Sequence, residues 1–132
     1  MTAWDDVARI CLALPETTEG TSRGTRQWLV RGKAFVWERP LRKKDLAELG
    51  DAEPTGPVVA AYVPDEGAKN ALVADEPDVY FTTAHFAGYP VVLCRLDALD
   101  AQSLTELAVE AWSCRAPERL LAQHPALPDR SP

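Results

Sequence analysis

The fold of this chain is decided by the stretch Asp78-Val-Tyr-Phe-Thr-Thr-Ala-His-Phe-Ala-Gly-Tyr-Pro-Val-Val-Leu-Cys-Arg-Leu96. Two short apolar runs, residues 79–81 and 91–93, flank a turn that holds the only Gly-Tyr-Pro of the sequence. The second run is apolar at consecutive positions, which is typical of a strand that is buried on both faces or covered by helices. The stretch therefore predicts a pair of strands, with His85 in their connection.

Helical patterns lie outside this stretch at both ends of the chain. Apolar residues recur at helical spacing over residues 4–14, where Pro15 ends the helix, and over residues 101–115, where Asp100 suits the N-cap. Between them, residues 41–50 allow a short helix, residues 58–63 predict a two-sided apolar strand, and Asp65 suits the N-cap of a helix over 65–74. In that last helix we expect the inward residues to be Ala68, Ala71 and Leu72.

Residues 28–37 predict a β-hairpin. With Gly32-Lys33 as its two turn residues, glycine occupies the position of a type II′ turn that needs positive φ. This register pairs Val30 with Phe35 and Trp28 with Trp37, and it places all four on one face. Residues 16–24 are open to two interpretations, a loop or an irregular first strand.

Two helices with one apolar face each are most simply accommodated on one face of an antiparallel sheet. The sequence therefore predicts an α+β two-layer domain over residues 1–124, followed by a frayed tail over 125–132 that includes three prolines. The residues that we expect to be largely buried are Trp4, Leu14, Val59, Ala61, Val92, Leu93, Leu107 and Trp112.

The composition indicates where the protein works. The first residues lack a basic leader and a long apolar run, so we expect neither a secretion signal nor a membrane span. Cys11, Cys94 and Cys114 lie among apolar neighbours without a Cys-x-x-Cys pair, which predicts buried, reduced thiols and a cytoplasmic location. A nucleophilic or redox thiol is the alternative.

The charge is distributed unevenly along the chain. Residues 23–44 hold eight basic residues and one acidic residue, a net +7, although the whole chain carries −6. The remainder is therefore at −13. A basic patch on an acidic body attracts an anion locally, while the overall charge argues against tight, non-specific coating of nucleic acid.

The order of several short motifs resembles the MmcQ/YjbR family of small bacterial proteins. The resemblance covers about Trp4 to Leu121, and its motifs are Leu14-Pro15, Val30-Arg31-Gly32-Lys33-Ala34-Phe35, Leu72, Pro77, Tyr80-Phe81, His85-Phe86, Gly88-Tyr89-Pro90, Leu96-Asp97 and Ala111-Trp112. It implies a CyaY/frataxin-like fold, in which helices pack on a twisted antiparallel sheet. Family members are commonly labelled DNA-binding by analogy of fold, and the family implies no catalytic residues.

Candidate nucleic-acid contacts come from the basic segment. They are Arg26, Arg31, Lys33, Arg42, Lys43 and Lys44, which would neutralise phosphates, and the alternative is a solvated polar face. Trp28, Phe35 and Trp37 suit stacking on unpaired bases, but the predicted register favours a buried face.

The other candidate site residues are His85 and Tyr89. We expect them to line a shallow cleft, or His85 to orient its turn by hydrogen bonding. Asp5 and Asp6 point apart on a helix, so iron binding by analogy with frataxin is not expected.

The residues thus predict a small, non-enzymatic, cytoplasmic binding domain without catalytic residues, cofactor or metal. DNA is the expected partner, bound weakly and in a salt-dependent way through the basic hairpin and loop. A protein or small-ligand interaction module without nucleic-acid binding is the alternative, and an enzyme that uses His85 ranks third. We expect a monomer with no membrane partner, and the sequence leaves any protein partner open.

Overall fold

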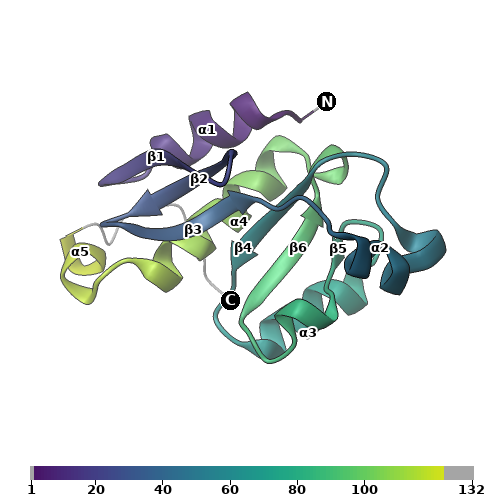
Figure 1. Ribbon diagram of the computed structural model, residues 1–132. Coiled ribbons are helices and arrows are strands. Elements are labelled where there is room, and N and C mark those ends of the chain that lie inside the picture. The colour runs from purple at the N-terminus through teal and green to yellow at the C-terminus, as the bar shows by residue number, and fades with distance from the viewer. Residues whose placement is uncertain (1, 124–132) are drawn as a thin grey trace.

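The computed structural model describes residues 2–123, so His124 and the tail predicted over 125–132 lie outside the described residues. The described residues form a single sheet, with helices before, between and after its strands (Figure 1). In chain order the elements are α1 Trp4–Leu12, β1 Thr17–Ser22, β2 Thr25–Val30, β3 Lys33–Glu38, α2 Lys43–Leu49, η1 Gly50–Ala52, β4 Val58–Tyr62, α3 Glu66–Asp75, β5 Tyr80–Phe81, η2 Ala84–Phe86, β6 Val91–Arg95, η3 Leu96–Ala98, α4 Ala101–Arg115 and α5 Glu118–Gln123.

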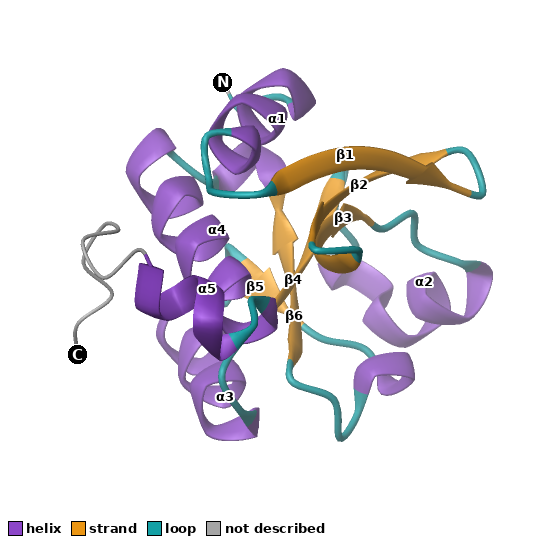
Figure 2. Cartoon of the chain, turned by 90° about the vertical axis from the view of Figure 1, so that its left-hand side faces the viewer, coloured by secondary structure: helices purple, strands orange, loops and turns teal. Residues whose placement is uncertain are grey.

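The six strands lie in the order β1-β2-β3-β4-β6-β5, and each neighbouring pair is antiparallel. Figure 2 shows α1, α4 and α5 on one side of the sheet and α2 on the other. The α+β class with helices packed on an antiparallel sheet is confirmed. None of the helices in the described part of the chain is long and apolar enough to cross a bilayer.

The stretch around β5 and β6 forms the predicted strand pair. Strand β6 lies between β4 and β5, so it is hydrogen-bonded on both edges. Val92 and Cys94 belong to the core beneath the helices, whereas Val91 and Leu93 belong to a second apolar cluster on the opposite face. The prediction of a strand buried on both faces is confirmed.

The predicted register of the β2–β3 hairpin is wrong. Arg31 and Gly32, with φ of 51° and 82°, are the two central residues of the turn, which makes it type I′ rather than type II′. Val30 consequently pairs with Lys33 instead of Phe35. The predicted turn was shifted by one residue because glycine suits both the second central position of a type I′ turn and the first central position of a type II′ turn.

A β-bulge in the same hairpin then redistributes the aromatic residues. The register shifts between Trp28 and Leu29, so Trp28 pairs with Val36 and Trp37 pairs with Gln27. Trp28 and Phe35 are fully buried beneath the helices. Trp37 instead packs against the second cluster on the opposite face. The expectation that all three aromatic residues share one face is therefore corrected.

Strand β1 settles the open interpretation of residues 16–24 in favour of a strand. It pairs with all of β2 and turns through Arg23 and Gly24, which also have positive φ. The turn places Arg23 at the exposed tip of the β1–β2 hairpin.

The core agrees with the prediction at seven of its eight residues. Trp4 is the exception, because it is only half-buried. Its ring stacks on that of Trp28, with the ring centroids 6.1 Å apart. Ala71 is exposed rather than inward, and the buried residue of α3 is Lys69. Helix α1 also ends at Leu12, two residues before the predicted end.

Candidate functional site

A cleft of about 610 Å³ lies on the sheet face that α1 and α4 do not cover. Side chains alternate between faces along a strand, so Gln27 and Trp37 point away from the buried Trp28. They form the floor with Ala34 and Tyr62. The end of α4 adds Arg115 to this floor. The rim comes from the β1–β2 turn, from the segment between β3 and α2 and from η2, through Ser22, Arg23, Thr25, Glu38, Arg39, Pro40, Leu41, Arg42, His85 and Phe86. We call this the open-face cleft.

Two aromatic residues and a guanidinium group meet at the floor. The ring centroids of Trp37 and Tyr62 lie 5.7 Å apart with their planes tilted by 57°. The Arg115 guanidinium lies 4.3 Å from the Tyr62 ring centroid, and its Nε donates to the Ala34 carbonyl at 3.3 Å. The last turn of α4 thus supplies a cation that is held at the floor by a ring and a carbonyl.

One arginine of the rim is structural. Arg39 is buried, and its Nη2 donates to the Asp45 carboxylate at 3.3 Å. The same carboxylate oxygen accepts from the Arg42 backbone N at 2.9 Å, which fixes the start of α2. The Arg39 guanidinium also lies 5.3 Å from the Phe86 ring centroid, so this ion pair joins α2 to η2.

Helix α2 and a buried lysine hold η2 in place from two sides. The Glu48 carboxylate accepts from the Ala84 backbone N at 3.0 Å. Lys69, 2% exposed, donates through Nζ to the carbonyls of Phe86 at 2.8 Å and Tyr89 at 3.0 Å. This support fixes the cleft wall that carries His85, whose exposed ring meets Phe86 edge-on at 4.8 Å.

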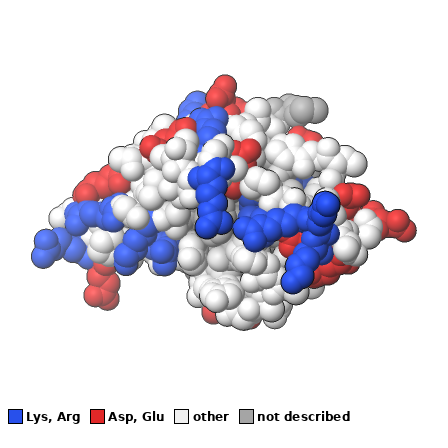
Figure 3. Space-filling view, viewed as in Figure 1, with Lys and Arg blue, Asp and Glu red and all other residues white. Residues whose placement is uncertain are grey.

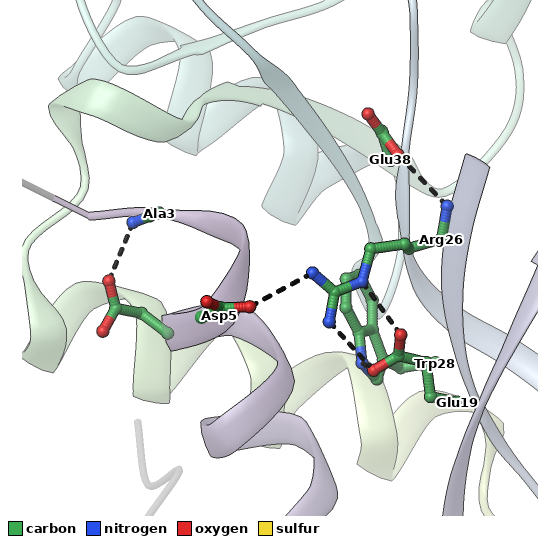
Figure 4. Close-up of polar contacts among 7 residues, drawn as sticks. Ala3, Asp5, Glu19, Arg26, Trp28 and Glu38 are labelled. Carbon is green, nitrogen blue, oxygen red and sulfur yellow. Dashed lines mark hydrogen bonds and ion pairs between the residues drawn. The ribbon is translucent and has the colours of Figure 1, made fainter.

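Two of the predicted nucleic-acid contacts are already paired with carboxylates. Arg26 lies on the helix side of the sheet, where it bonds to Glu19 at 2.9 Å and reaches Asp5 at 3.5 Å (Figure 4). Its hydrogen bonds lower the pKa of the Glu19 carboxyl and raise the pKa of the guanidinium. Arg31 is paired with Glu16 in the same way, and that contact raises the pKa of the Arg31 guanidinium.

The other predicted residues are spread over two places. Lys33 is exposed beside the β2–β3 turn, while Arg42, Lys43 and Lys44 are exposed at the start of α2. Among residues 2–123, none of these four side chains has a carboxylate partner. Arg42 and His85 line the open-face cleft, but Tyr89, although 61% exposed, does not.

The sequence did not single out four residues of this cleft, namely Arg23, Gln27, Tyr62 and Arg115. Arg23 was counted in the basic segment, but nothing in its neighbours places it at a cleft. The alternation of exposed and buried positions in β2 marks Gln27 as the opposite face from Trp28. For Arg115, which lies 81 residues from its acceptor Ala34, no local signal exists.

Figure 3 shows the charge on the face seen in Figure 1. Lysine and arginine side chains extend across the middle of this face, and most of the acidic side chains in view lie toward its edges. The lysine and arginine side chains on this face form separate groups with uncharged residues between them. Such groups attract a negatively charged ligand locally.

Comparison with known proteins identifies the relatives of this chain. The YjbR family model matches residues 12–114. Uncharacterized protein Rv2570 of Mycobacterium tuberculosis and uncharacterized protein Mb2600 of Mycobacterium bovis are each 50% identical over 124 residues, which cover 92% of this chain and 94% of the relative.

A solved structure shares the fold. The crystal structure of Deinococcus radiodurans protein DR2400, with domain DUF419, superposes with a TM-score of 0.66 at 18% identity, and the match covers 99% of this chain and 93% of that chain. The family match spans most of the sequence and agrees with the resemblance seen in the motifs. The chain therefore belongs to the MmcQ/YjbR family.

Proposed function

We propose that this chain is a non-enzymatic binding protein that takes nucleic acid in the open-face cleft. One observation carries the proposal: Arg23 and Arg42 stand at the rim of a cleft whose floor holds Trp37 and Tyr62. Guanidinium groups recognise phosphate, and aromatic rings recognise bases. The DNA-binding label of the family adds only an analogy of fold.

The ion pairs narrow the set of phosphate contacts. Arg26, Arg31 and Arg39 already neutralise carboxylates of the chain, so a phosphate would have to compete for them. Within the basic segment of residues 23–44, the cations without a carboxylate partner in the described structure are Arg23, Lys33, Arg42, Lys43 and Lys44. Because the rest of the chain is acidic, we expect only a few contacts and a dissociation constant in the micromolar range or weaker.

The surroundings of His85 favour binding over catalysis. A histidine that acts as a base is usually oriented by a second polar group within about 3.2 Å. Within residues 2–123, the His85 ring packs edge-on against Phe86 and makes no side-chain hydrogen bond. The carboxylate at the rim, Glu38, accepts instead from the Arg26 backbone N at 3.1 Å. A cytoplasmic location fits both the partner and the cysteines, which form no disulfide.

The test is a titration of fluorescently labelled single-stranded and duplex DNA, followed by anisotropy at several salt concentrations. Log affinity should fall with log salt by about 0.7 per phosphate contact for a single strand and about 0.9 for duplex. The variant Arg23→Gln/Arg42→Gln should bind more weakly with a flatter slope.

The matched control is Arg9→Gln/Arg31→Gln. It removes the same charge from two exposed side chains that are already paired with Asp6 and Glu16, so binding should change little. Equal loss in both variants would show a response to net charge rather than a site. No binding of either DNA at tens of micromolar protein would refute the proposal.

The size of the cleft favours one second candidate, a small anionic ligand. A volume of about 610 Å³ lies within the range of about 300–1,000 Å³ that is common for small-molecule sites. On this alternative, the protein would bind a phosphorylated metabolite and ignore oligonucleotides. Thermal shift with nucleotides and sugar phosphates, in parallel with the DNA titration, separates the two.

A further inference from the structure

We infer that the open-face cleft takes an unpaired nucleotide, so that the protein binds single-stranded nucleic acid in preference to duplex. This inference rests on the proposed function and adds the class of partner. Its basis is the position of the aromatic surface: Trp37 and Tyr62 form the floor of the cleft, and Arg23 and Arg42 stand at the rim.

A duplex cannot use such a floor. Its phosphates lie outside and its base faces are hidden in the stack, so it would contact only the rim. A single strand can turn a base inward, where the face of the base stacks on an aromatic ring or a guanidinium plane. Burying aromatic surface behind a basic rim therefore favours strands whose bases are unpaired.

The floor offers two surfaces for stacking and one group for hydrogen bonding. Trp37 is half-buried, with its orientation fixed by its strand and by the tilted contact with Tyr62. Arg115 presents its guanidinium beside it, already held on Tyr62 and the Ala34 carbonyl. The Gln27 amide makes no side-chain hydrogen bond within residues 2–123, so its donor and acceptor are available to a base edge.

The rim is arranged to hold the backbone of that strand. Arg23 lies at the tip of the β1–β2 turn, and Arg42 precedes α2, so two separate elements supply phosphate contacts to the same cleft. The cleft volume of about 610 Å³ suits one nucleotide rather than a helix. Lys43 and Lys44 extend the basic rim beyond it, where the strand would continue.

Three ligands of equal length and label separate base stacking from charge: a thymidine strand, a strand of abasic sites with the same phosphates, and a duplex. We expect the thymidine strand to bind at least about fivefold more tightly than the abasic strand, because a base stacked on an aromatic ring strengthens binding by about that factor or more. It should also bind more tightly than the duplex. This comparison uses the unaltered protein, so no variant has to fold.

A tryptophan variant assigns the stacking surface. Trp37→Leu should remove most of the advantage of the thymidine strand over the abasic strand. Trp4→Leu is the matched control, since it removes a half-buried tryptophan on the opposite face. Equal binding of thymidine and abasic strands, or tighter binding of duplex, would overturn this inference while the proposed function stands. Failure of all three ligands to bind would overturn both.

Discussion

Replacing Lys69 by methionine should destabilise the protein more than any surface substitution. Lys69 lies in α3 with a 2% exposed side chain, and its ammonium bridges the carbonyls of Phe86 and Tyr89. Methionine keeps the length and the apolar stem but removes the charge and both donors. The Phe86 and Tyr89 carbonyls would then keep only their backbone donors, the N–H groups of Tyr89 at 3.0 Å and Val91 at 2.8 Å.

The magnitude follows from these two bonds. A hydrogen bond to a charged group contributes about 1.5–3 kcal/mol, so two contribute about 3–6 kcal/mol. Methionine also avoids the desolvation of an ammonium, which offsets part of this loss. The nearby Glu66 carboxylate, at 3.6 Å and half-exposed, adds little. We therefore expect the free energy of unfolding to fall by about 2–4 kcal/mol.

Urea unfolding followed by tryptophan fluorescence measures this loss, with Lys43→Met as the control. Lys43 is exposed at the start of α2, so its replacement should change the free energy of unfolding by less than about 0.5 kcal/mol. A loss below about 1 kcal/mol for Lys69→Met would refute the assignment of Lys69 as the support of η2. Because η2 carries His85 at the cleft, binding of the thymidine strand should also weaken in a folded Lys69→Met protein.

Three further predictions concern the turns, the thiols and the response to acid. Gly32→Ala should lower the free energy of unfolding, measured in urea, by about 1–2 kcal/mol. The loss comes from backbone strain alone, because φ is 82° and the added Cβ meets no atom within 4 Å. An unchanged free energy of unfolding would contradict the type I′ turn. At pH 8 Ellman's reagent should find three thiols in the unfolded chain. In the native protein it should react slowly with Cys11 and Cys94, since burial raises the pKa of Cys11 to about 12 and also raises that of Cys94. A rapid reaction at Cys94 in the native protein would contradict its burial. Folding lowers the pKa of the Asp6 and Asp100 carboxyls through backbone hydrogen bonds and that of the Glu19 carboxyl through Arg26. Their contribution to stability is therefore complete above the unfolded pKa values of 3.8 for aspartate and 4.5 for glutamate, and it is lost as pH falls through the lower folded values. The melting temperature should be constant from pH 7 to about 5 and drop below about pH 4.5, whereas a maximum at pH 3 would contradict the direction of these pKa shifts.

The sequence by itself determined the fold class and the course of most elements. The helices that begin at Trp4 and Ala101 and the two-sided strands around Val59 and Val92 follow from apolar spacing, which depends only on near neighbours. The sequence also predicts Asp65 and Asp100 as N-caps, because a cap depends only on one side chain and a backbone amide three residues later. The family followed from the order of short motifs along the chain.

The tertiary structure alone decided which charges and aromatic rings are available to a ligand. The bulge that turns Trp37 away from Trp28 depends on packing across strands, since both registers suit the local turn chemistry. Arg26 and Arg31 are neutralised by carboxylates 7 and 15 residues away, and Arg115 reaches the cleft from another layer. Lys69 resembles any exposed helical lysine until the chain folds its ammonium against two carbonyls of a distant turn. A binding site that is assembled from separate strands and helices has no period in the sequence, so only long-range packing specifies it.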